Sequence, residues 1–132
     1  MISVDLARAL RTAGLPWDPA TGDWFVVDAE ELLDDRLVLS TLTVDVHRYA
    51  TGTVLGFNGT TEWALDSVAV SDTLWLPTED QLRDRLGEAF TRLDRPAGSW
   101  RVELSVEGSA ISFVSPGAAD AYGRALLHLL TR

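Results

Sequence analysis

The feature that most constrains the fold of this chain is an alternating stretch at residues 37–49. Its apolar side chains share one parity along the chain, at Val38, Leu42, Val44 and Val46. Its polar and aromatic side chains take the other parity, at Thr41, Thr43, Asp45, His47 and Tyr49. Because successive side chains of a strand point to opposite faces, this pattern predicts one long strand with a buried and an exposed face. Such a strand requires a sheet and a layer that covers one side of it.

Turn signals predict that this strand pairs with its neighbours in antiparallel fashion. Asn58-Gly59 lies between two apolar runs, and both residues tolerate the positive φ angles of a tight hairpin turn. With a further turn near residues 51–52, the segment is expected to form a three-stranded meander. Glu107-Gly108 divides a later apolar segment in the same way and predicts a C-terminal hairpin.

Three segments have the apolar periodicity of amphipathic helices. The first begins after Ser3, whose hydroxyl suits an N-cap, and ends at Gly14. The second begins after Thr78, which has the capping-box spacing to Gln81. The third lies within the last segment, residues 116–132. The apolar positions of the three predicted helices are Ile2, Leu6, Ala9, Leu10 and Ala13, then Leu82, Leu86, Ala89, Phe90 and Leu93, then Ala118, Tyr122, Ala125, Leu126, Leu129 and Leu130.

The mixture of alternating strands and striped helices predicts the α+β class. A length of 132 residues with 46% hydrophobic and 23% charged residues is typical of one globular domain. We therefore expect a single α+β domain over residues 1–132. Its sheet is mainly antiparallel, built from the meander and the C-terminal hairpin, and packs with about three helices in two layers.

Composition excludes several kinds of chemistry and partner. The chain has no cysteine and no lysine, so thiolate nucleophiles, thiolate metal sites and Schiff-base lysines are ruled out. The net charge of -9 disfavours nucleic acid and anionic lipid as partners. The sequence shows neither a secretion signal nor a membrane span, which predicts a cytoplasmic protein. We expect no cofactor.

The strongest candidate for catalysis is the polar face of the alternating stretch. Asp45, His47 and Tyr49 share this face, and Glu62 lies on a neighbouring strand of the predicted meander. A carboxylate beside a histidine is the arrangement of general-base catalysis. The alternative is an ordinary polar sheet face, because alternation alone explains these residues and a one-residue change of register moves Glu62 to the opposite face. No metal site is predicted, because the acidic residues 30–35 lack the spacing of a calcium loop.

Five tryptophans give the second group of candidate residues. Trp17, Trp24, Trp63 and Trp75 are candidates for a binding surface, since exposed tryptophans are common anchors of protein interfaces. The alternative is that these rings, like Trp100, pack over the ends of the core. Trp17 is the first candidate for an exposed anchor, because it lies in a loop between two prolines.

Two segments, "VLGFNGTTEWALDS" and "LWLPTEDQLRDRLGEAF", carry a resemblance that extends over almost the whole chain. The chain resembles a group of small acidic proteins from high-GC bacteria, which are often labelled pilus assembly proteins. A looser similarity, in "GDWF" and "WLPTEDQL", is to short phage-associated proteins. The resemblance implies no established activity, cofactor or catalytic residue.

These features favour a non-enzymatic protein-binding or regulatory module of the immunity-protein type, with a protein partner that carries basic residues. Acidic charge, tryptophans and few catalytic groups are the reasons. The alternative is a small-molecule-binding protein or an enzyme that uses the Asp45 and His47 strand face. The oligomeric state is left open.

Overall fold

The computed structural model describes residues 1–40, 44–57 and 67–132. In this part of the chain it has three α-helices and three antiparallel sheets of three strands each, which confirms the α+β class and the antiparallel pairing. The helices are α1 (Val4–Thr12), α2 (Glu79–Leu86) and α3 (Ala118–Leu130). The strands are β1 (Trp24–Val27), β2 (Leu37–Val38), β3 (Val44–Tyr49), β4 (Gly52–Phe57), β5 (Ser67–Ala69), β6 (Thr73–Leu76), β7 (Phe90–Asp94), β8 (Trp100–Val106) and β9 (Ser109–Ser115).

The contacts within the chain divide it into two compact units. The first, called here the helical unit, comprises residues 1–16 and 77–132, and the second, the double-sheet unit, comprises residues 17–76. The expectation of one domain over residues 1–132 stays a prediction. Among the described residues, no helix has both the length and the apolar character that crossing a membrane requires.

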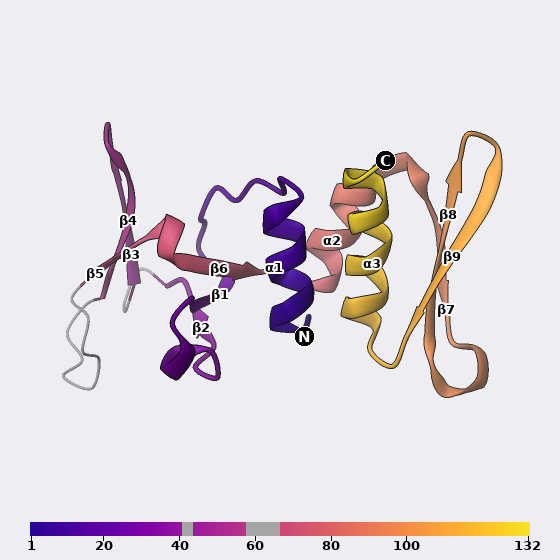
Figure 1. The fold of residues 1–132 in the computed structure, drawn as a ribbon, viewed down its shortest axis with the longest axis horizontal. Helices are drawn as coiled ribbons and strands as arrows, with labels where there is room; N and C mark the ends of the chain where they lie inside the picture. The colour runs from indigo at the N-terminus through magenta and orange to yellow at the C-terminus, as the bar shows by residue number, and fades with distance from the viewer. Residues whose placement is uncertain (41–43, 58–66) are drawn as a thin grey trace. The chain divides into compact units, whose positions relative to one another are not determined.

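The helical unit is built on the sheet β7-β8-β9. Helix α3 packs against β8 and β9, and α1 and α2 pack against α3, as Figure 1 shows. The largest fully buried side chains of this unit come from the residue two positions before α1, from all three helices and from β8: Ile2, Leu10, Leu82, Tyr122, Val102 and Leu104. The apolar stripes predicted for the helices therefore converge on one core. The predicted hairpin at Glu107-Gly108 is confirmed, because it joins β8 to β9.

Helix starts agree with the capping signals of the sequence. Ser3 Oγ accepts the Leu6 N–H at 3.3 Å and caps α1. The Thr78 N–H donates to Gln81 Oε1 at 2.9 Å, as in the capping box predicted for α2. Capping satisfies backbone N–H groups that the first turn leaves without helical partners. Local side-chain chemistry thus sets where these helices begin.

The end of the second helix differs from the prediction. The apolar spacing extends the helix through Phe90 to Leu93, but α2 ends at Leu86 and the strand β7 begins at Phe90. Gly87 has a φ of 58°, a left-handed conformation that glycine adopts easily and that stops a helix. The Phe90 ring then packs on Tyr122 of α3, with 5.7 Å between ring centroids. Phe90 reaches the same core from a strand instead of a helix.

Gly123 brings α1 close to α3. A Cβ atom at this position would lie 2.7 Å from Leu6 Cδ2 and 3.1 Å from Ile2 Cδ1, and real Cβ atoms do not approach other atoms as closely as 2.7 Å. The residue is buried in the middle of α3, where glycine costs about 1 kcal/mol relative to alanine. The close contact between the two helices offsets that cost.

We expect Gly123→Val to lower the free energy of unfolding by about 1–3 kcal/mol, the usual cost of overpacking a core. The added Cβ atom alone already meets the Leu6 side chain at 2.7 Å. Urea denaturation measures the change. In a Leu6→Ala background the same substitution has room, so its cost should fall markedly. Equal costs in the two backgrounds would contradict the contact between Gly123 and Leu6.

The outward face of the β7-β8-β9 sheet carries cross-strand ion pairs. Arg101 donates through Nε to Asp94 Oδ1 at 2.9 Å and through Nη2 to Asp94 Oδ2. Arg92 and Glu103 approach to 3.6 Å. The hydrogen bonds and positive charge of Arg101 lower the pKa of Asp94 below its ordinary value of 3.8. Opposite charges on facing strands stabilise the pairing of β7 with β8.

This lowered pKa predicts a pH dependence of stability. Because the folded pKa of Asp94 lies below its unfolded value of 3.8, the contribution is complete above that value and is lost as the pH falls through the folded pKa. We expect Asp94→Asn to reduce the loss of stability between weakly and strongly acidic pH. Urea denaturation at a series of acidic pH values tests this. Parallel stability curves for the variant and the wild type would count against it.

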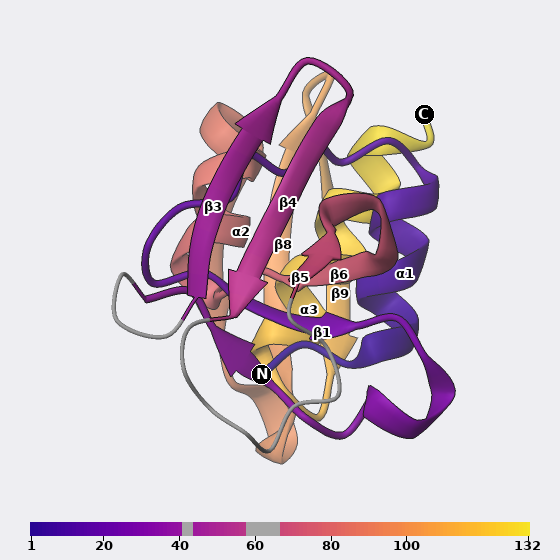
Figure 2. The same ribbon diagram turned by 90° about the vertical axis from the view of Figure 1, so that its left-hand side faces the viewer.

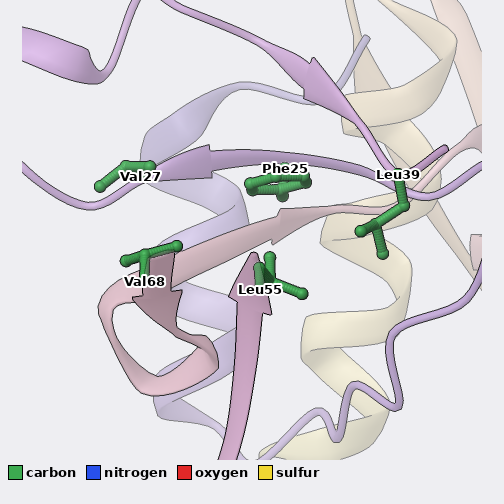
Figure 3. Packing of buried hydrophobic residues seen from close by; sticks show 5 residues of the cluster. All are labelled: Phe25, Val27, Leu39, Leu55 and Val68. Atoms are coloured by element: carbon green, nitrogen blue, oxygen red, sulfur yellow. The ribbon is translucent and has the colours of Figure 1, made fainter. Parts of the chain in front are cut away.

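The double-sheet unit contains two small sheets, ordered β2-β1-β6 and β3-β4-β5. A core cluster of this unit consists of five buried side chains, which Figure 3 shows gathered between the strands: Phe25, Val27, Leu39, Leu55 and Val68. The strands β3, β4 and β5 pair in consecutive antiparallel order as a meander, with the first turn at residues 50–51. The third strand, β5, begins at Ser67, later in the chain than the prediction placed it. The hairpin predicted at Asn58-Gly59 lies outside the described residues.

The single strand predicted for residues 37–49 is wrong. Residues 37–38 form β2, which pairs with β1, whereas residues 44–49 form β3 in the other sheet. The alternation also predicts the wrong side chain to be buried at this point. Val38 is predicted on the buried face but is exposed, whereas the next residue, Leu39, is buried in the core. The alternating pattern therefore spans two strands with different burial.

Candidate functional site

The outer face of the β3-β4-β5 sheet is the candidate site. Residues that lie opposite each other in antiparallel strands share a face. Leu55 pairs with Val68, and both are buried in the core. The neighbouring pairs, His47 with Val54 and Val54 with Ala69, therefore point away from that core. Figure 2 shows β3 and β4 as a long pair with β5 beside β4.

His47 and Tyr49 are the large side chains of this face. Both are exposed, and Tyr49 keeps 61% of its residue surface accessible. Their rings lie nearly parallel, with 6.3 Å between centroids and 20° between planes. The two rings form a continuous aromatic surface on β3, called here the His47–Tyr49 platform.

Small residues flank the platform. Tyr49 lies opposite Gly52, and His47 lies opposite Val54, which is followed on the next strand by Ala69. These positions add no side chain larger than valine, so the two rings are not covered from the β4 side. The platform is therefore open to a partner that approaches the sheet from outside.

An open hollow lies next to the platform. It has a volume of about 480 Å³ and is lined by Thr51, Gly52, Thr53, Val54, Ala69, Val70 and Ser71. These residues come from the β3–β4 turn, from β4, from the end of β5 and from the 3-10 turn Val70–Asp72 that follows it. The lining residues are small, and three of the seven are threonine or serine, which carry hydroxyl groups.

Arg48 fastens the β3–β4 hairpin on the side away from the platform. Its Nη2 atom donates to the Pro19 carbonyl at 2.9 Å and to Asp18 Oδ1 at 3.2 Å. Since Arg48 alternates with His47 and Tyr49 along β3, these bonds hold the strand without using the platform side chains. No sequence motif marks Arg48, and its only signal is its place between the two aromatic residues.

The predicted catalytic arrangement is only partly within the described residues. His47 is exposed, but the side chain of Asp45 and all of Glu62 lie outside the described part. Among the described side chains, no carboxylate contacts His47. The described residues also contain no group of three or more histidine, aspartate or glutamate side chains placed to hold a metal ion. General-base catalysis by Asp45, His47 and Glu62 stays a prediction.

The tryptophans of the double-sheet unit lie in or near its core. Trp75 is buried, Trp24 is half-buried, and Trp63 lies outside the described residues. Trp17 is half-buried and stacks on Trp75, with 6.2 Å between centroids and 4° between planes. Its indole Nε1 donates to Asp23 Oδ2 at 2.9 Å. A role of these four residues in binding stays a prediction, but Trp17 already has a packing partner and a hydrogen-bond acceptor within its own unit.

Asp23 is a buried carboxylate that organises the loop before β1. Besides the Trp17 indole, the Ala20 N–H donates to Asp23 Oδ2 at 3.0 Å. The Asp23 carbonyl accepts the Leu39 N–H at 2.8 Å. Buried carboxylates require such donors. Asp23 therefore has a structural role that its sequence position did not reveal.

No family model matches this chain, and comparisons with curated proteins and with solved structures likewise find no match. The resemblance to small acidic proteins of high-GC bacteria stays a prediction. The exposed groups of the molecule are therefore the basis on which a function can be inferred.

Proposed function

We propose that this chain is a non-enzymatic protein-binding module that docks through the outer face of the β3-β4-β5 sheet. The observation that carries the proposal is the His47–Tyr49 platform, two exposed aromatic rings beside small residues. Tyrosine is an effective interface anchor, because its ring gives a large contact area at low entropic cost and its hydroxyl forms hydrogen bonds. The platform offers these properties without rearrangement of the sheet.

The proposed partner is a protein with a basic surface. The net charge of -9 attracts positively charged surfaces over long distances and speeds their encounter. An arginine or lysine of the partner gains further attraction when it lies over an aromatic ring. Both effects favour a regulatory role in which this chain occupies a basic site of another protein.

The open hollow supports a second candidate function, the binding of a small molecule. Its volume of about 480 Å³ falls in the usual range of ligand pockets, about 300–1,000 Å³. An enzyme that uses Asp45 and His47 would require such a ligand beside the platform. A thermal shift with a metabolite panel, lost in Val54→Trp because the bulky ring fills the hollow, would favour this candidate over protein binding.

Capture from native cell extract tests the protein-binding proposal. We expect the tagged protein to retain one partner in stoichiometric amount, and to release it as salt rises, because screening weakens attraction between charged surfaces. Mass spectrometry identifies the partner and its charge. A folded bait that retains no protein at low salt would contradict the proposal.

A further inference from the structure

The strand β9 forms an edge of the sheet in the helical unit, whose residues are all described. The strand order is β7-β8-β9, so β9 pairs only with β8. Its seven residues, SAISFVS, include no charged residue, no proline and no glycine. An uncharged and regular edge strand is a template for pairing with another strand.

The hairpin geometry shows which backbone groups of β9 point outward. The turn has two residues, Glu107 and Gly108, both with positive φ, and Val106 faces Ser109 across it. In such a hairpin the closing pair exchanges hydrogen bonds, and every second pair along the strands does the same. The intervening residues Ala110, Ser112 and Val114 therefore direct their N–H and C=O groups away from β8.

One contact supports this assignment. Arg124 of α3 donates through Nη1 to the Val114 carbonyl, so this carbonyl does face away from β8. The bond leaves the N–H groups of the edge untouched. A carbonyl oxygen also accepts a second hydrogen bond, so Arg124 does not prevent another strand from pairing with Val114.

The opposite edge of the same sheet is protected. The strand β7 carries a bulge between Phe90 and Arg92, and its outward face has the charged residues Arg92 and Asp94. Pro96 follows the strand after one intervening residue, Arg95. Bulges, charges and proline are the usual devices against edge pairing, and β9 has none of them in its own sequence.

We propose that β9 pairs with the β9 strand of a second copy of this chain, antiparallel and centred on Ser112. Ser112 then faces Ser112 of the second copy, and Ala110 faces Val114. Each of these facing pairs exchanges two backbone hydrogen bonds through the outward groups. The two three-stranded sheets join into one continuous sheet across a two-fold axis.

The side chains favour a second copy as the occupant. On the helix side, Phe113 faces Ile111 of the second copy, and such an aromatic and β-branched pair stabilises a sheet. On the outer side, the exposed Val114 covers Ala110 of the second copy. The absence of charge on β9 also matters, since a strand with acidic residues would repel its copy in a protein of net charge -9.

Sedimentation of the full chain over a wide range of concentration tests this proposal. We expect a monomer–dimer equilibrium in the wild type. Ser112→Glu places two carboxylates opposite each other at the two-fold axis and should give a monomer at every concentration. Ser112→Ala keeps the backbone groups and should still dimerise. Ala110→Glu, at another outward position, should weaken the dimer independently.

Folding of each variant is checked by its thermal unfolding curve, because residues 110 and 112 are exposed and their substitution leaves the β8–β9 bonds intact. A wild type that stays monomeric at the highest concentrations would overturn the proposal. So would a dimer that tolerates both Ser112→Glu and Ala110→Glu in folded protein.

Discussion

Phe25→Ala is expected to lower the free energy of unfolding of the double-sheet unit by about 3–5 kcal/mol. The Phe25 side chain is fully buried and lies in the centre of the cluster with Leu39, Leu55 and Val68 (Figure 3). Its truncation loses the transfer free energy of the ring and leaves a cavity that these neighbours fill only in part. Urea denaturation monitored by tryptophan fluorescence measures the change.

Val38→Ala is the matched control, because Val38 is an exposed apolar residue on β2, the strand that pairs with β1. We expect its effect to stay within about 0.5 kcal/mol. If Phe25→Ala and Val38→Ala changed stability equally, the core of this unit would lie elsewhere. A loss of about 4 kcal/mol would also be a large share of the stability of an ordinary domain.

Trp17→Ala is the second substitution with a large expected effect, a loss of about 2–4 kcal/mol, because the ring is only half-buried and large aromatic truncations in full cores cost about 3–5 kcal/mol. The variant loses the stack on Trp75, the contact with Phe25 and the bond to Asp23. Chemical denaturation with a circular-dichroism readout avoids the fluorescence change that removal of an indole causes.

Trp17→Phe separates the two roles of this side chain. The phenyl ring keeps most of the packing but cannot donate to Asp23, so we expect a loss of about 1–3 kcal/mol, the usual cost of removing one partner of a buried polar group. The opposite result is also informative. If Trp17→Ala left stability unchanged but removed binding of the captured partner, Trp17 would be an exposed anchor.

Helix starts and hairpins were predictable because they depend on local chemistry. Ser3 and Thr78 cap their helices through bonds to residues three positions away, and Glu107-Gly108 forms the tight turn its residue types favour. Such signals are complete within a few residues of sequence. These elements could therefore be predicted without knowledge of their tertiary contacts.

The predictions of the end of the second helix and of the strand at residues 37–49 were wrong because distant residues decide which side chains are buried there. The apolar spacing that continues to Leu93 is typical of a helix, but the helix ends just before Gly87. Phe90 packs instead on Tyr122, which lies far along the chain. In the same way, Leu39 is buried by Phe25 and Leu55 rather than by its place in an alternating pattern. Periodicity reports a local preference, and tertiary contacts override it.

The candidate site was predictable in part. Alternation placed His47 and Tyr49 on one face, which the register of β3 with β4 also gives. The exposure of this face was not predictable, because it depends on which small residues of β4 and β5 lie beside His47 and Tyr49. In the structure these residues are Gly52, Val54 and Ala69. Which residues lie opposite is a matter of strand register, and a single sequence fixes register poorly.

The measurement that tests the proposed binding surface most directly is a titration of the captured partner with wild type, Tyr49→Ala and Val38→Ala. Both substitutions remove exposed apolar side chains of the double-sheet unit, but only Tyr49 belongs to the platform. We expect Tyr49→Ala to weaken binding by about 2 kcal/mol or more, near 30-fold in Kd, and Val38→Ala to bind as the wild type does. Equal affinities for wild type and a folded Tyr49→Ala variant would contradict docking through the β3-β4-β5 face.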